Sequence, residues 1–66
     1  MEIFINEDKK LLLEELSIYD LLKLLNVDSN GIVIEHNQKI VKKDSWNSTI
    51  IKNEDKIEII IFMGGG

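Results

Sequence analysis

Residues 56–63 read KIEIIIFM and form the most strongly apolar stretch of the sequence. A short run of β-branched residues after a group of turn formers, here Asn53-Glu54-Asp55, predicts a β-strand. Side chains alternate across a strand, so this strand has two faces. The face that we expect to pack against the core carries Ile57, Ile59 and Ile61.

A helix is predicted over Ile18 to Asn26, because apolar residues recur there at the i, i+3, i+4 and i+7 positions of one helical face. This apolar stripe consists of Ile18, Leu21, Leu22 and Leu25. Ser17 and Asp20 have the spacing of a capping box, in which a hydroxyl and a carboxylate bind free amide groups at the helix start. The turn formers of residues 28–31 end the helix.

Shorter segments have the β-branched or alternating pattern of strands: residues 2–6, 10–14, 32–35 and 39–42. Residues 10–14 could also begin a helix on propensity alone, since Leu and Glu are good helix formers. A helix that begins at Ile18 leaves them outside, so we interpret them as a strand. It pairs with the first strand as a hairpin, with residues 6–9 as the turn. The polar residues 44–49 are expected to form a loop with one helical turn, after which Ile50 and Ile51 return to the core.

The order strand, strand, helix, strand, strand, strand predicts an α+β fold of the β-grasp (ubiquitin-like) kind. In this fold a mixed sheet of four to five strands packs on one helix. We expect the last strand to run parallel to the first, with both in the centre of the sheet. Residues 1–63 are expected to form this domain and residues 64–66 a flexible glycine tail. The predicted core consists of Ile3, Ile5, Leu11, Leu13, Ile18, Leu21, Leu22, Leu25, Ile57, Ile59 and Ile61.

Composition limits the classes of function. A chain of 66 residues has room for one small domain, and its 44% apolar and 30% charged residues are typical of a folded one. The sequence has no cysteine, which excludes disulfides, thiolate metal sites and thiol nucleophiles. Its net charge is −4 and it has no arginine, so we expect no nucleic-acid partner.

Cytoplasmic localisation is expected. The opening residues, Met1 to Phe4, lack the basic segment of a signal peptide. The longest apolar run, Ile59 to Met63, is far shorter than the ~20 residues that span a bilayer, so no membrane partner is expected. Small secreted domains usually need disulfides, which this sequence cannot form.

Gly64-Gly65-Gly66 follows directly on the most apolar strand. Such a run is most often a flexible linker. A glycine chain has no Cβ, however, so it can pass through a channel too narrow for other residues. Fully extended, these residues reach at most ~10 Å beyond the strand. We therefore expect Gly64 and Gly65 to be the side-chain-free segment that enters a partner's active site, and the α-carboxylate of Gly66 to be the reactive group.

The other face of the last strand is the expected docking surface for partners. Alternation places Ile60 and Phe62 there, beside the tail, and we expect Phe4 and Leu12 to join them. No catalytic residues are expected. The sequence has no Walker or GxGxxG motif, and His36 is its only histidine, so no bound nucleotide or metal is predicted either.

The pattern, length and Gly-Gly ending resemble the ThiS family of sulfur carriers in the thiamine pathway. Further matches are Asn37 before Lys39-Ile40-Val41, and Trp46 five residues after Val41. Two positions depart from the family: Lys42 stands where proline is frequent and Glu54 where glycine is frequent. Neither position carries chemistry.

The resemblance implies a protein co-substrate and not an enzyme. An E1-like adenylyltransferase would use ATP to adenylate the Gly66 carboxylate. Sulfur, supplied by a cysteine desulfurase route, would convert the adenylate to a thiocarboxylate, and thiazole synthase would take the sulfur. ATP would be used by the partner, with no cofactor bound by this chain.

Other functions fit the same pattern. The small subunit of molybdopterin synthase shares the fold, tail and chemistry, but it tends to be longer and often has proline before the final glycines. A ubiquitin-like modifier joined to lysines, or an interaction module with incidental glycines, also remains open. Conjugation predicts high-mass adducts, whereas the carrier predicts a free chain that bears sulfur.

Overall fold

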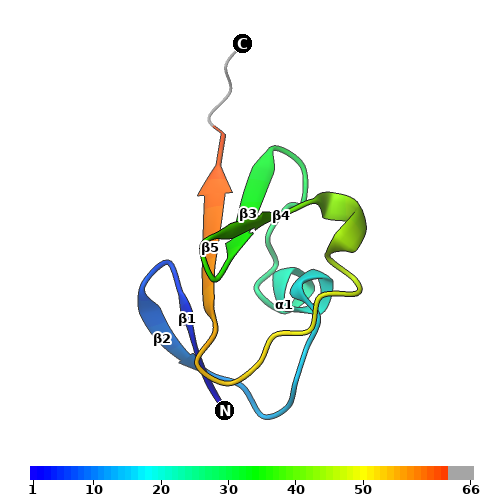
Figure 1. Cartoon of the computed structure of the whole chain (residues 1–66). Coiled ribbons are helices and arrows are strands. Elements are labelled where there is room, and N and C mark those ends of the chain that lie inside the picture. Colours follow the sequence, from blue (N-terminus) through cyan, green and yellow to red (C-terminus); the bar gives the residue numbers. More distant parts are fainter. Residues whose placement is uncertain (63–66) are drawn as a thin grey trace.

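The computed structural model describes residues 1–62, which form a sheet with one α-helix across one face (Figure 1). The helix is α1 (Ile18–Leu24). The strands are β1 (Glu2–Ile5), β2 (Asp8–Leu11), β3 (Ile32–His36), β4 (Lys39–Val41) and β5 (Lys56–Ile61). A 3₁₀ turn over Lys43–Ser45 follows β4.

The sheet is mixed, with the strand order β2-β1-β5-β3-β4. The first and last strands, β1 and β5, are parallel neighbours in its centre, with Phe4 beside Lys56 and Ile5 beside Ile57. The other neighbouring pairs are antiparallel. This arrangement confirms the predicted fold class and the adjacency of the two chain-end strands.

The start of α1 is as predicted, and its end comes earlier. The Ser17 hydroxyl accepts a hydrogen bond of 3.0 Å from the Asp20 N–H, which is one half of the predicted capping box. The helix stops at Leu24 and not at Asn26, because Asn26 has a φ of 58° and a left-handed residue ends a helix. Within residues 1–62, no helix has the length and apolar character needed to span a bilayer.

The core agrees with the prediction in part. Its buried residues are Ile3, Leu12, Ile18, Leu21, Leu22, Ile34, Trp46, Ile51 and Ile57. Ile5, Leu25 and Ile59 are partly buried against this cluster. The predicted core positions Leu11, Leu13 and Ile61 are wrong, since all three side chains are exposed.

The error at Leu11 and Leu13 comes from the first turn. Asn6 and Glu7 have φ values of 48° and 73°, so they form a tight two-residue hairpin turn in place of the predicted turn over residues 6–9. Ile3 consequently pairs with Lys10, and Leu12, two residues further, lies on the same inner face. A shift of one residue reverses every side chain of a strand, so Leu12 becomes the core residue.

Trp46 is buried in the core, with 3% of its surface exposed. Its indole N–H donates a hydrogen bond of 2.9 Å to the Val41 carbonyl, which satisfies its polar atom inside the core. The Trp46 carbonyl accepts from the Tyr19 N–H at 3.2 Å. Trp46 thus joins the 3₁₀ turn to both β4 and α1.

The register of β2 can be tested with two adjacent leucines. Leu12→Ala should lower the free energy of unfolding by about 2–4 kcal/mol, because it opens a cavity in the core. Leu13→Ala, which changes a fully exposed side chain, should change that free energy by less than about 0.5 kcal/mol. Urea unfolding measures both. Equal losses, or a larger loss at Leu13, would contradict the observed register.

Candidate functional site

The predicted tail, Gly64, Gly65 and the reactive Gly66, lies outside the described residues, as does Met63. The structure describes the strand that leads to it. β5 ends at Ile61, and Phe62 follows as the last described residue. The site is therefore built from β5 and the strands beside it.

An exposed apolar patch covers the outer face of the sheet near the end of β5. Ile60 lies directly opposite Val33, and alternation puts Phe62 on the same face. Ile40 of β4, opposite Glu35, is a diagonal neighbour of Val33. We call these four residues the outer patch: Val33, Ile40, Ile60 and Phe62. Ile60 is 41% exposed and Phe62 64%, which leaves apolar surface open where the described residues end.

The prediction that Leu12 joins the docking surface is wrong. It is 5% exposed and packs inside the core, because the tight turn at Asn6 and Glu7 directs it inward. Phe4 does lie on the outer face, half-buried beside Lys56, but a row of charged residues separates it from the outer patch.

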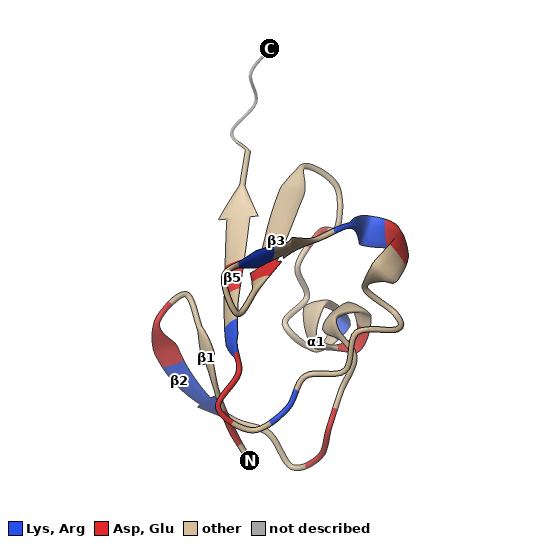
Figure 2. Ribbon diagram, viewed as in Figure 1, with Lys and Arg blue, Asp and Glu red and all other residues tan. Residues whose placement is uncertain are grey.

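That row is acidic. Glu35 and Glu58 lie directly opposite each other across β3 and β5 (Figure 2). Together with Glu7 and Lys56 they line a shallow hollow next to Phe4. Like charges directly opposite each other destabilise a sheet by a few tenths of a kcal/mol. The outer face therefore changes from acidic at the middle of β5 to apolar at its end.

The inner face also becomes exposed toward the end of β5. Ile57 is buried, Ile59 is partly buried, and Ile61 is 61% exposed opposite Ile32. Figure 1 shows the arrowhead of β5 extending past α1, which accounts for this gradient. The predicted core position of Ile61 fails for this reason, and the end of β5 presents apolar side chains on both faces.

The start of β5 is held by a polar network that the sequence did not reveal. The carboxylate of Asp55 lies 2.6 Å from His36 Nε2, and it accepts hydrogen bonds from the Lys52 N–H at 2.8 Å and the Asn37 side chain at 3.1 Å. The Asn37 side chain also accepts from the Lys56 N–H at 2.9 Å. This network joins the β3–β4 turn to the first residue of β5.

Burial of the Asp55 carboxyl acts to raise its pKa. The hydrogen bonds from His36, the Lys52 N–H and Asn37 outweigh that effect, so the pKa of Asp55 lies below its usual value of 3.8. His36, the last residue of β3, is engaged in this contact. Among residues 1–62, no three His, Asp or Glu side chains gather in a group that could hold a metal ion.

The model of the ThiS family matches the whole chain, residues 1–66. The chain belongs to the ThiS family. The sulfur carrier protein ThiS of Bacillus subtilis is 32% identical over 50 residues, which cover 76% of each chain. The crystal structure of the thiamine biosynthesis protein ThiS from Geobacter metallireducens superposes with a TM-score of 0.88 and 28% identity, covering 100% of both chains.

A further relative of the chain is a thiazole synthase of Paramagnetospirillum magneticum, 35% identical over 66 residues. The match covers all of this chain but only 20% of that protein. A ThiS-like segment and a thiazole synthase thus occur there in one polypeptide.

The positions that carried the family resemblance have structural roles. Asn37 has a φ of 51° in the β3–β4 turn and bonds Lys56, while Trp46 fills the core. Sequence reasoning missed the network around Asp55. The sequence signal for this network was Asn37, at the first left-handed position of the β3–β4 hairpin turn.

The Asp55 network predicts a specific acid sensitivity. The pKa of Asp55 is lower in the folded chain than in the unfolded chain. Asp55 therefore stabilises the fold at every pH above its pKa in the unfolded chain, and this stabilisation is lost as the pH falls through its pKa in the folded chain. Asp55→Asn should cost about 1–3 kcal/mol at pH 7, by loss of charge-assisted hydrogen bonds, and should reduce the stability loss below pH 3.8.

Urea unfolding at pH 7, 5, 4 and 3 measures both effects. Glu54→Gln, at an exposed carboxylate of the same turn, is the matched control and should leave the acid-dependent loss unchanged. An unaltered acid profile in the Asp55 variant would contradict the proposed cause.

Proposed function

We propose that this chain is a sulfur carrier for the thiazole of thiamine, and that Gly66 carries the sulfur. The observation that carries this proposal is the match of the whole chain to the ThiS family, together with the B. subtilis relative named as a sulfur carrier. The exposed apolar patch at the end of β5, immediately before the glycines in the sequence, supports it.

The chemistry requires a partner. A C-terminal carboxylate with a pKa of about 3.5 is ionised at neutral pH and is a poor electrophile. One of its oxygens attacks the α-phosphate of ATP, pyrophosphate leaves, and an acyl-adenylate forms. The outer sulfur of a persulfide then attacks the acyl carbon and AMP leaves, which gives an acyl disulfide. A thiol attacks the other sulfur of that bond, is oxidised to a disulfide, and releases the thiocarboxylate. The sequence has no phosphate-binding motif, so an E1-like adenylyltransferase supplies the ATP site and this chain is the substrate.

The glycines suit this role sterically. Gly64 and Gly65 add no Cβ, so a partner can close a narrow channel around the main chain and still admit it. The channel orients the Gly66 carboxylate against the reacting phosphate, where an error of about 1 Å can cost a hundredfold in rate.

Two partners take the tail in turn, the adenylyltransferase and then thiazole synthase. We assign docking of both to the outer patch, with Ile60 and Phe62 as its anchors next to the tail. The P. magneticum relative, in which a ThiS-like segment is part of a thiazole synthase, supports the second partner. A cysteine desulfurase route supplies the sulfur.

The reactive position is tested by intact-mass measurement. The protein is incubated with the adenylyltransferase of the same organism, ATP and a sulfur source. We expect a gain equal to one sulfur replacing one oxygen. An extra residue after Gly66 moves the carboxylate by ~3.5 Å and should abolish the gain, and Gly65→Ala should reduce its rate strongly.

Both variants should unfold at the same urea concentration as the wild type, which separates an effect on transfer from one on folding. An extended chain that still gains the mass would show that the reactive position is not the Gly66 carboxylate.

The outer patch is tested by Phe62→Asp. Burying a carboxylate in an apolar interface should weaken binding to each partner by more than about 1 kcal/mol, or fivefold in Kd. Leu13→Asp places the same charge on a fully exposed leucine of the β2–α1 connection and is the control. Titration calorimetry gives both values. Equal affinities of the two variants would exclude Phe62 as an anchor.

A further inference from the structure

One edge of β5 is open near its end. Across the β3–β5 pair, the Phe62 N–H donates to the Gly31 carbonyl and the Asn37 N–H donates to the Lys56 carbonyl. Backbone groups alternate in direction along a strand, so the even-numbered residues of β5 bond toward β3 and the odd-numbered ones face β1. In agreement, the Ile57 carbonyl accepts from the Asn6 N–H on the β1 side.

Asn6 is the last residue to bond this edge. β1 ends at Ile5, and the Asn6 side chain takes the place of a next strand residue. Its Oδ1 accepts from the Ile59 N–H at 2.7 Å, and its Nδ2 donates to the Ile59 carbonyl at 3.3 Å. The chain then turns away into β2. Within residues 1–62, the N–H and C=O of Ile61 on this side have no partner strand.

Figure 1 also shows that β1 ends before β5 does: the β1–β2 turn lies beside the middle of β5, and only β3 lies beside the arrowhead of β5. Ile61 is a non-hydrogen-bonded position of the β3 pairing, so both of its backbone groups face the open side.

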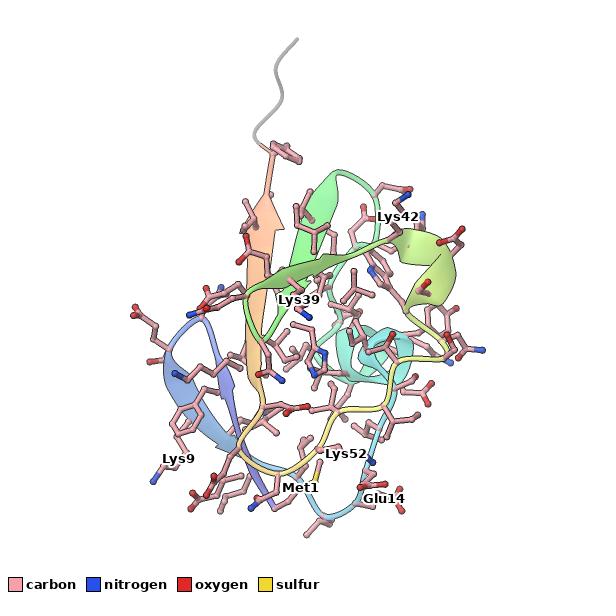
Figure 3. The ribbon with its side chains drawn as sticks, in the orientation of Figure 1. Met1, Lys9, Glu14, Lys39, Lys42 and Lys52 are labelled. Atoms are coloured by element: carbon pink, nitrogen blue, oxygen red, sulfur yellow. The ribbon has the colours of Figure 1, made fainter. Side chains whose placement is uncertain are left out.

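The open edge differs from the two outer edges of the sheet. β2 carries Lys9 and Lys10, and β4 begins with Lys39; Figure 3 shows the Lys9 side chain extending away from the sheet. Lysines on an edge strand prevent another chain from pairing with it. The end of β5 has no charged residue after Glu58. Its exposed side chains are Ile60, Ile61 and Phe62.

We propose that an extended segment of thiazole synthase adds to β5 as a strand beside Ile61, in the place that β1 leaves vacant. The Ile61 N–H donates to a carbonyl of that segment, and the Ile61 carbonyl accepts from one of its N–H groups. This inference rests on the proposed function and specifies how the synthase holds the carrier. Addition of a strand to an exposed edge is a recurrent mode of recognition, in which main-chain bonds give affinity and flanking pockets give specificity.

Strand addition gives the synthase a fixed register. Once Ile61 is paired, Gly66 lies five residues further along the chain, within at most ~17 Å. Side-chain docking at the outer patch orients the domain, whereas main-chain pairing at Ile61 sets the distance from the strand to the carboxylate. The synthase is chosen as the occupant because a ThiS-like segment is part of the same polypeptide as a thiazole synthase in P. magneticum.

The test compares Ile61→Pro with Ile61→Ala. Both remove the isoleucine side chain, but only proline removes the N–H. Since that N–H faces the open edge, proline breaks no hydrogen bond of the sheet and both variants should fold. The Kd of Ile61→Pro for thiazole synthase of the same organism should be at least tenfold higher than that of Ile61→Ala. Equal Kd values would overturn the proposal.

Amide hydrogen exchange of the wild type provides a second measurement. In the free protein the Ile61 amide should exchange much faster than those of Ile59 and Phe62, which have acceptors at 2.7 and 2.9 Å. A saturating concentration of the synthase should slow exchange of the Ile61 amide at least tenfold. Binding without this protection overturns strand addition alone, whereas no binding overturns the assigned partner. Protection that instead rises with the concentration of the free protein would show a second copy at the edge and overturn the proposal.

Discussion

The structure depends on a mismatch in length between β5 and the strand beside it. The parallel pairing of β1 with β5 brings the two ends of the chain together and buries Ile3 and Ile57 beneath α1. That pairing stops at Ile57, whereas the pairing with β3 continues to Ile61. β5 is therefore held on both sides at its start and on one side at its end. The Asp55 network strengthens the start, so a rigid body presents a strand end whose side chains and one edge are free to meet a partner.

Much of the fold follows from local pattern. The period of Ile18, Leu21 and Leu22 and the Ser17 cap predict the helix, and the β-branched run of residues 56–63 predicts β5. The hairpin register could not be predicted, because it depends on Glu7 taking a φ of 73°, a conformation that few residues other than glycine and asparagine favour. Leu11, Leu12 and Leu13 are alike in hydrophobicity, so nothing in their composition distinguishes the buried one. Ile51 returns to the core as expected, whereas Ile34 and Trp46 were missed because their burial is set by long-range packing.

The candidate site likewise has features that local sequence predicts and features that it does not. Alternation alone places Ile60 and Phe62 on a common face, and the role proposed for Gly66 comes from the family resemblance. The opposed Glu35 and Glu58, the Asp55 network and the open edge at Ile61 all depend on strand register or on where a neighbouring strand ends. These features arise between segments that are distant in sequence, so no local motif predicts them. The outer patch and the open edge nonetheless meet at the same end of β5, and together they offer a partner both side-chain and main-chain contacts.

The central claim is that this chain carries sulfur as a free protein, and the intact mass of the protein purified from its native organism tests it most directly. The account predicts an unconjugated chain, a fraction of which is heavier by one sulfur in place of one oxygen, with the modification located at Gly66 by fragmentation. Chains joined through Gly66 to lysine side chains of other proteins, with no thiocarboxylate form, would contradict it and would indicate a ubiquitin-like modifier.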